Sequence, residues 1–120
     1  MSPVSSGMDF SSQRGRVRDD VGLVVLSGEV DIATAPRFRE DLVALVEEGV
    51  KNVIVDLLGV TFIDSTALGV LIGGVRRLHP GGGRLVLVAD GRPVMRALTL
   101  TGLDRVFTIC STREQAVAAL

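Results

Sequence analysis

The sequence predicts a single α/β domain built around a mainly parallel β-sheet. Short runs of β-branched and aliphatic residues alternate along the chain with segments whose apolar residues recur at helical spacing. Strands that alternate with helices are typical of parallel sheets with right-handed crossovers. The 120 residues, of which 47% are hydrophobic, are enough for one compact core. That core must be aliphatic, because the chain has four Phe and no Trp or Tyr.

The first half of the chain predicts a tail, two strands and a helix. Residues 1–13 are rich in Ser with scattered Gly and Pro, which is typical of a disordered tail. Residues 14–18 are expected to form an edge strand, which would be antiparallel to residues 22–27 because a tight turn joins the two. A helix is predicted for residues 35–48, with Thr34 as its N-cap.

The second half alternates strands and helices without a repeat or a linker. Residues 53–57 and 85–88 are nearly continuous apolar runs, as in strands that are covered on both faces. A capping box from Ser111 to Glu114 predicts the last helix. The remaining elements are a central helix that ends near Leu78, a helix that Pro93 opens and Gly102 closes, and a strand at 106–109. The predicted order is therefore β-β-α-β-α-β-α-β-α.

The central motif of the chain is Asp64-Ser65-Thr66, which lies between a buried strand and the central helix. Apolar residues return at helical spacing after this triplet, so the triplet falls at a helix N-terminus. Helix N-termini present unpaired N–H groups and about half a positive charge. A hydroxyl placed there is a good acceptor site for a phosphate. The residues alone leave two schemes open: Ser65 as the capping hydroxyl, or Asp64 as the cap with Ser65 exposed at the first helical position.

Asp31 is expected to lie beside this motif. Asp31 and the Asp64-Ser65 pair both come directly after predicted strands. Function in such sheets tends to lie beyond the carboxyl ends of the strands, so these residues should share one edge of the sheet. Asp31 also has a structural interpretation, as a cap for the helix that begins near Ala35, although Thr34 is the closer candidate.

Composition excludes several classes of function. Thirteen basic residues against fourteen acidic residues give no field that would favour nucleic acid or an anionic membrane. One Cys (Cys110) and one His (His79) exclude an internal disulfide and the usual structural zinc sites. No apolar run has transmembrane length, and no signal peptide opens the chain. We therefore expect a cytoplasmic protein that uses no cofactor and binds neither nucleic acid nor membrane.

No motif in the chain predicts catalysis. The glycines within residues 69–74 have the spacing of a phosphate-binding loop, but they lie inside the predicted helix and lack the following Lys. We expect them to permit close helix packing instead. Ser65 is not in a nucleophile elbow, because Ile63 stands where the first glycine belongs. His79 would lie at the far end of the same helix, about 20 Å from Ser65 at about 1.5 Å per residue. The chain is therefore not expected to be an enzyme.

Three segments carry a family resemblance. They are Gly28-Glu29-Val30-Asp31, the stretch from Val60 to Gly69, and Gly102-Leu103 before the last strand. In this order they resemble the anti-sigma-factor antagonists of the STAS domain family, and the match spans residues 14–120. The resemblance implies a small mixed sheet with helices packed mainly on one face. The sequence departs from the commoner family pattern at Ala67, where Gly is frequent.

The same resemblance implies which residues form the site. The phosphoacceptor of the family is the serine directly after the aspartate, which is Ser65 in this sequence. The acidic residue that matches Asp31 is associated with the phosphorylation site and the partner surface. The partner-binding residues implied in this way are Asp31, Asp64, Ser65, Thr66, Leu68 and Gly69.

The function implied by the resemblance is a switch between partners. The unphosphorylated antagonist binds an anti-sigma factor, itself an ATP-dependent serine kinase, and so frees a sigma factor. Phosphorylation by that kinase breaks the complex, and a serine phosphatase restores it. One alternative is a STAS module that serves as a scaffold or transporter-associated subunit without being phosphorylated. A small enzyme is a third, disfavoured interpretation.

Overall fold

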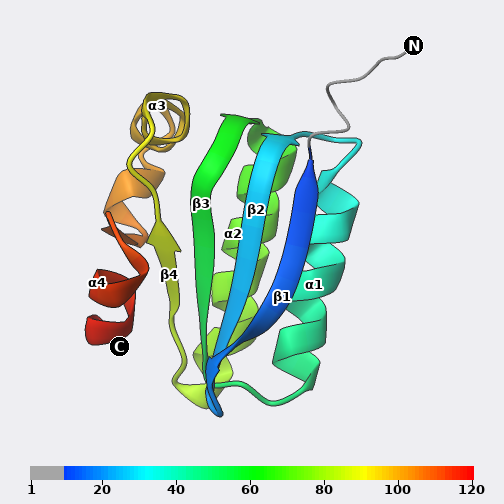
Figure 1. Cartoon of the computed structure of the whole chain (residues 1–120), viewed down its shortest axis with the longest axis vertical. Helices are drawn as coiled ribbons and strands as arrows, with labels where there is room; N and C mark the ends of the chain where they lie inside the picture. Colours follow the sequence, from blue (N-terminus) through cyan, green and yellow to red (C-terminus); the bar gives the residue numbers. More distant parts are fainter. Residues whose placement is uncertain (1–9) are drawn as a thin grey trace.

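The computed structural model describes residues 10–120, which form a five-stranded sheet with helices on both faces (Figure 1). In chain order the elements are β1 (Ser11–Arg18), β2 (Val21–Val30), α1 (Ala35–Glu47), β3 (Asn52–Ile63), α2 (Ser65–Leu78), the 3-10 turn η3 (His79–Gly81), β4 (Leu85–Val88), α3 (Arg92–Leu100), the 3-10 turn η4 (Leu103–Arg105), β5 (Thr108–Cys110) and α4 (Arg113–Ala118). The strands lie side by side in sequence order; β1 is antiparallel to β2, and the other neighbouring pairs are parallel. The predicted fold class and the antiparallel edge strand are confirmed.

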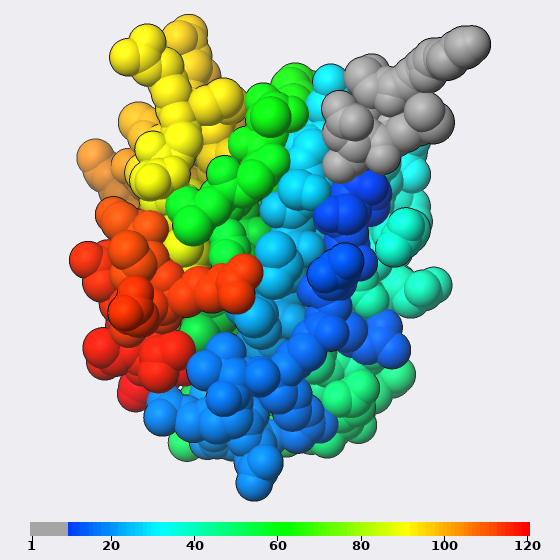
Figure 2. Space-filling view, in the orientation of Figure 1, coloured from blue at the N-terminus to red at the C-terminus, as the bar shows by residue number. Residues whose placement is uncertain are grey.

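The helices are divided unequally between the two faces of the sheet. The main core forms where α1, α2 and α3 pack, and it includes Phe38 of α1, Leu71 of α2 and Leu98 of α3. On the other face α4 contributes Ala116 to a smaller apolar cluster with β2, β3 and β4. Side chains of β1, β2 and β3 reach the surface beside the orange and red C-terminal segments in Figure 2. The short helix α4 therefore covers only part of its face.

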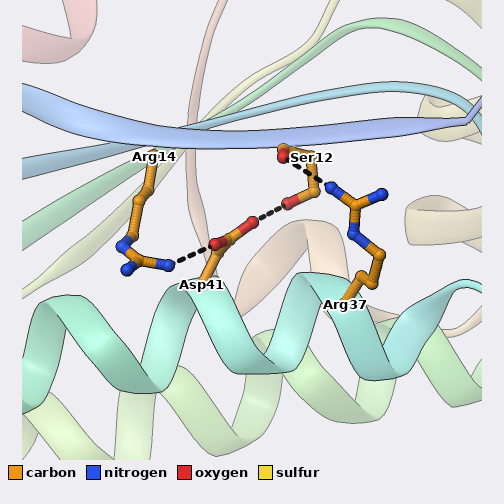
Figure 3. Close-up of polar contacts among 4 residues, drawn as sticks. All are labelled: Ser12, Arg14, Arg37 and Asp41. Carbon is orange, nitrogen blue, oxygen red and sulfur yellow. Dashed lines mark hydrogen bonds and ion pairs between the residues drawn. The ribbon is translucent and has the colours of Figure 1, made fainter.

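β1 begins at Ser11, three residues before the predicted strand, and polar contacts with α1 hold this earlier part (Figure 3). The Ser12 hydroxyl donates to Asp41 Oδ2 at 2.6 Å. Arg14 Nη1 forms an ion pair with Asp41 Oδ1 at 2.7 Å. These contacts join positions far apart in the sequence, so the local composition that predicted a tail could not reveal them. Residues 1–9 of the predicted tail lie outside the described residues.

β3 is longer than the apolar run that predicted it. It continues to Ile63, so the predicted short connection before Asp64 is strand. The register with β2 shifts between Val25 and Ser27 and again between Gly28 and Glu29. Such irregularities interrupt the alternation of inward and outward side chains on which a sequence-based strand prediction depends.

Two predicted features near the carboxyl end are displaced along the chain. β5 starts two residues later than predicted, because the backbone N–H groups of Val106 and Phe107 donate to Leu103 O at the end of the turn η4. The cap of α4 is Thr112, whose hydroxyl accepts from the Gln115 N–H at 3.1 Å. Gln115 Oε1 in turn accepts from the Ser111 N–H at 2.9 Å. The capping residues are therefore Thr112 and Gln115, one position after the predicted pair.

Of the glycines in α2, Gly74 has the predicted packing role. A Cβ at Gly74 would lie 2.7 Å from both Leu42 Cδ2 and Leu85 Cδ1, so α2 approaches α1 and β4 closely at this point. A Cβ at Gly69 would meet no heavy atom within 4 Å, and one at Gly73 would meet only an arginine side chain. The packing prediction is wrong for Gly69 and Gly73, because these positions do not face the core.

Candidate functional site

The candidate site lies at the carboxyl ends of β2 and β3. These strands are parallel neighbours, and their last residues, Val30 and Ile63, are paired in register. The backbone N–H of Asp64 donates to Val30 O at 3.2 Å, so the two loops that follow the strands start side by side. The predicted convergence of Asp31 with Asp64 and Ser65 is confirmed. We call the surface formed by these three residues the rim.

Asp64 is the N-cap of α2. Its backbone is extended, with φ −113° and ψ −177°, and its Oδ1 accepts from the Ala67 N–H at 3.1 Å. The sequence left two capping schemes open, and the structure has the one in which Asp64, and not Ser65, is the cap. Ser65 occupies the first helical position with an exposed side chain, and its hydroxyl is not needed for the cap.

Asp31 organises the loop between β2 and α1. Its Oδ1 accepts from the backbone N–H groups of Ala33 at 2.9 Å and Thr34 at 3.1 Å. Thr34 is at the N-cap position of α1, as predicted, but its side chain makes no capping bond. The Thr34 hydroxyl instead donates to Glu29 O at 2.8 Å and accepts from the Asp31 N–H at 2.9 Å. Neither Thr34 nor Asp31 therefore caps α1 through its side chain, and the Asp31 carboxylate holds the loop before the helix instead.

The other residues named from the sequence lie at different depths. Thr66 and Gly69 are exposed on α2, close to Ser65 in the helix. Leu68 is only 5% exposed and belongs to the main core, because it lies on the face of α2 that packs against the sheet. Its side chain is consequently not available as a surface contact. It can anchor the helix that presents Ser65.

Two exposed apolar residues near the rim were not among the predicted site residues. Ile32 is 75% exposed and directly follows Asp31. Phe62 is 48% exposed, near the end of β3. Exposed apolar groups beside a polar site are a feature of protein interaction surfaces. Ile32 could have been noticed in the sequence, because a large aliphatic residue in a short loop has no strand or helix to bury it.

A groove between α1 and α2 opens beside the same site. Its volume is about 670 Å³, and Thr66 of α2 is one of its lining residues. The rest of the lining is formed by Val70 of α2 and by Ala35, Pro36, Arg39, Glu40, Val43, Ala44 and Glu47 of α1. The sequence could not show this groove, because its existence depends on how far apart two helices pack.

The arrangement suits a phosphoryl acceptor rather than a catalyst. The exposed Ser65 hydroxyl is at the positive end of a 14-residue helix, where N–H groups and the helix dipole favour an anion. The Asp31 carboxylate already accepts hydrogen bonds from the backbone of its own loop, and the Asp64 carboxylate accepts one from the Ala67 N–H of α2. The one imidazole of the chain, His79, is at the opposite end of α2 and cannot act as a base for Ser65.

The helices were also compared with what a membrane-spanning helix requires. Within residues 10–120, none of the helices combines the length and the apolar character that crossing a bilayer requires.

The chain is similar to known proteins over most of its length. The model of the STAS domain family matches residues 14–116. The anti-sigma-B factor antagonist of Bacillus subtilis (strain 168) is 35% identical over 94 residues, which are 78% of this chain and 85% of that protein. A solved anti-sigma factor antagonist from Mycobacterium paratuberculosis is 30% identical, with a TM-score of 0.86 and 97% of each chain covered.

A further solved structure shows the same fold in a phosphorylated protein. It is the Bacillus cell fate determinant SpoIIAA in its phosphorylated form, which is 22% identical with a TM-score of 0.72. The superposition covers 91% of this chain and 98% of that one. At this identity the likeness is one of fold.

Proposed function

The chain belongs to the STAS domain family, and from this premise we propose that it is an anti-sigma-factor antagonist controlled by phosphorylation of Ser65. The unphosphorylated form binds an anti-sigma factor, which then releases its sigma factor. Similarity to antagonists from Bacillus subtilis and Mycobacterium paratuberculosis supports a regulatory rather than a catalytic role. The proposed partner surface contains Asp31, Ser65, Thr66 and Gly69, and Asp64 holds the end of α2 that presents Ser65.

The observation that carries this proposal is the position of Ser65. Its hydroxyl is exposed at the first residue of α2, and the capping bond is made by Asp64 instead. Ser65 can therefore gain a phosphate without losing a bond that the fold uses. Thr66 is also exposed, but it lines the groove between α1 and α2 rather than following the cap directly.

The anti-sigma factor is proposed to be the kinase. Ser65 Oγ attacks the γ-phosphorus of ATP held by that kinase, the bond between this phosphorus and the ADP oxygen breaks, and the hydroxyl proton passes to a base of the kinase. A serine phosphatase reverses the modification by adding water to the phosphorus, which returns the Ser65 hydroxyl and releases inorganic phosphate. In both reactions this chain supplies only the acceptor group.

The phosphate is proposed to act at the interface. It adds about −1.5 to −2 charges at pH 7. At the N-terminus of α2 this charge is favourable to the domain by roughly 0.3–1 kcal/mol, and repulsion from Asp31 and Asp64 offsets part of that gain. An interface shaped for a neutral hydroxyl must desolvate the new dianion without a matching positive charge. The complex should therefore dissociate while the fold stays intact.

The proposal is tested with purified wild-type protein and three variants. Wild-type and Ser65→Glu proteins are immobilised, and extract of the source organism is passed over both. We expect an anti-sigma factor to be retained by wild type alone. That factor is then incubated with ATP and the wild-type, Ser65→Ala or Thr66→Ala protein. Phosphopeptide mapping should find the phosphate on Ser65 in wild type and Thr66→Ala, and Ser65→Ala should bind without being modified.

Two results would contradict the proposal in different ways. Phosphate on Thr66 with Ser65 free would move the acceptor by one residue. A partner that binds wild type and never modifies it in the presence of ATP would favour the scaffold alternative.

A further inference from the structure

Helix α3 presents a mixed basic and apolar surface to solvent. Its buried residues, Val94 and Leu98, pack into the main core. On the outer side, residues spaced by three and four positions surround a hollow of about 440 Å³. We call these residues the α3 stripe: Arg92, Met95, Arg96, Thr99 and Leu100.

In the described part of the chain, the arginines of the α3 stripe do not stabilise the fold through ion pairs. The ion pairs found among residues 10–120 involve neither Arg92 nor Arg96. Arg92 is also the first residue of α3, and the first turn contains no acidic residue. A cation at this position is opposed by the helix dipole. Two exposed guanidinium groups therefore lie on one helix face without an ion-pair partner among the residues that the structure describes.

The apolar residues of the α3 stripe are not buried in the core either. Leu100 is 74% exposed and Met95 is half-buried, and both line the hollow. A hollow between apolar and cationic side chains can receive an apolar side chain while the arginines pair with carboxylates. The chemistry that fits this surface is an acidic segment with at least one large apolar residue.

The α3 stripe and Ser65 are at the same end of the molecule. β4 is parallel to β3, so the chain enters α3 at the edge of the sheet where α2 also begins. Figure 1 shows α3 almost end-on at the top of the molecule, beside the upper end of β3. A single partner that covers Ser65 can therefore extend to this helix.

We propose that the α3 stripe is a second docking surface for the anti-sigma factor, and that it binds an acidic, apolar segment of that protein. This inference rests on the proposed function. The rim carries the carboxylates Asp31 and Asp64, whereas the α3 stripe carries Arg92 and Arg96. The opposite signs of the two surfaces would fix the orientation in which the partner docks.

A protein segment fits the α3 stripe better than an anionic membrane does. The stripe is hollowed at its centre, and a side chain can enter a hollow that a bilayer surface would bridge. Its apolar residues are only Met95 and Leu100, which is little apolar area for insertion into a bilayer.

The test measures the affinity of the anti-sigma factor that wild-type protein retains and Ser65→Glu does not. Isothermal titration compares wild type with Arg92→Glu/Arg96→Glu and with the milder Arg92→Gln/Arg96→Gln. The matched control is Arg76→Glu/Arg77→Glu, which makes the same charge change in the last turn of α2, at the opposite end of the molecule. Leu100→Ala is compared with Leu58→Ala, because Leu58 is an exposed leucine on β3. Circular dichroism verifies that every variant is folded.

We expect the double charge reversal to weaken binding at least tenfold and the glutamine variant to weaken it severalfold, while the α2 control stays within about twofold of wild type. Leu100→Ala should weaken binding more than Leu58→Ala. The affinity of wild type should also fall more steeply with added salt than that of Arg92→Glu/Arg96→Glu. Unchanged affinity in the α3 variants, with Ser65→Glu still inactive, would overturn this inference and leave the proposed function standing.

Two other outcomes also overturn the inference. Binding of wild type to phosphatidylglycerol vesicles, lost in Arg92→Glu/Arg96→Glu while the anti-sigma factor binds both proteins equally, would assign the stripe to a membrane. If wild type binds no anti-sigma factor at all, the proposed function fails and this inference fails with it.

Discussion

At the scale of single residues, the rim separates groups that hold the structure from the group that is proposed to react. Asp64 caps α2, and Asp31 accepts two backbone N–H groups of the loop before α1. Both carboxylates therefore have structural partners, whereas Ser65 is exposed and is not part of either set of bonds. Because Asp31 and Asp64 hold the backbone around it, Ser65 can be presented in a fixed position and still be free to be modified.

Two substitutions separate the structural role of Asp31 in its loop from its proposed role in partner binding. Asp31→Ala should lower the free energy of unfolding by about 0.5–1.5 kcal/mol, because the backbone N–H groups of Ala33 and Thr34 lose their acceptor. Asp31→Asn keeps an oxygen at Oδ1 and should stay within about 0.5 kcal/mol of wild type. Urea unfolding followed by circular dichroism measures both. Equal stability of all three proteins would mean that the Oδ1 bonds contribute nothing measurable.

The Asn variant also tests whether Asp31 faces the partner. It removes the charge and leaves the loop in place, so a loss of affinity for the anti-sigma factor would come from the interface. Unchanged affinity would remove Asp31 from the proposed partner surface.

At the scale of elements, α2 has glycines on two functionally different sides. Gly74 is buried where α2 meets Leu42 of α1 and Leu85 of β4. Gly69 is exposed one turn after Ser65, with open space where a Cβ would be. The same residue type therefore serves helix packing at one position and leaves a bare surface at the other.

Alanine substitutions at these two glycines should have opposite effects on stability. Gly69→Ala should raise the free energy of unfolding by about 0.4–1 kcal/mol, because alanine restricts the unfolded chain and favours the helix. At Gly74 the same gain is opposed by overpacking, which costs about 1–3 kcal/mol, so Gly74→Ala should be less stable than wild type. Thermal and urea unfolding provide the measurement. Stabilisation by Gly74→Ala would show that Leu42 and Leu85 move aside at little cost.

Gly69→Ala also tests the proposed partner surface. If a partner approaches α2 closely beside Ser65, the added methyl group should weaken binding although the domain is more stable. Titration of the anti-sigma factor against wild type and Gly69→Ala measures this effect. Equal affinities would show that Gly69 lies outside the contact area.

At the scale of the whole molecule, polar contacts attach outer elements to both sides of the sheet. On one side Asp41 of α1 holds β1 through Ser12 and Arg14 (Figure 3). On the other side Arg113 of α4 forms an ion pair with the buried Asp56 of β3, at 2.6 Å between Nε and Oδ2. These contacts lie outside the rim. A charge added at Ser65 therefore does not directly break the polar contacts that hold the helices on the sheet.

We accordingly expect phosphorylation to change binding and to preserve the fold. Phosphorylated protein and Ser65→Glu should keep the circular dichroism spectrum and the melting temperature of wild type. Their affinity for the anti-sigma factor should fall at least tenfold, which corresponds to about 1.4 kcal/mol. Ser65→Ala serves as the control and should bind normally. A large loss of helicity that accompanies the loss of binding would show that the switch is conformational rather than electrostatic.

The sequence alone determined the order of the elements, the parallel sheet and the convergence of Asp31 with Ser65. These features depend on local patterns, since apolar periodicity defines strands and helices, and parallel strands bring their carboxyl ends to one edge. The central helix was predicted to begin at the Asp64-Ser65-Thr66 triplet, and the structure places its first residue at Ser65. The proposed role of Ser65 as phosphoacceptor also came from the sequence, through the family resemblance.

Tertiary structure decided the features that depend on distant partners or on spacing. β1 starts at Ser11 because Asp41 binds Ser12 and Arg14 from another element, and no local pattern records that contact. Leu68 proved to be a core residue because the rotation of α2 against the sheet turns it inward. The groove beside Thr66 and the hollow of the α3 stripe exist only once helices are packed, since each depends on distances between side chains that the order of residues does not specify.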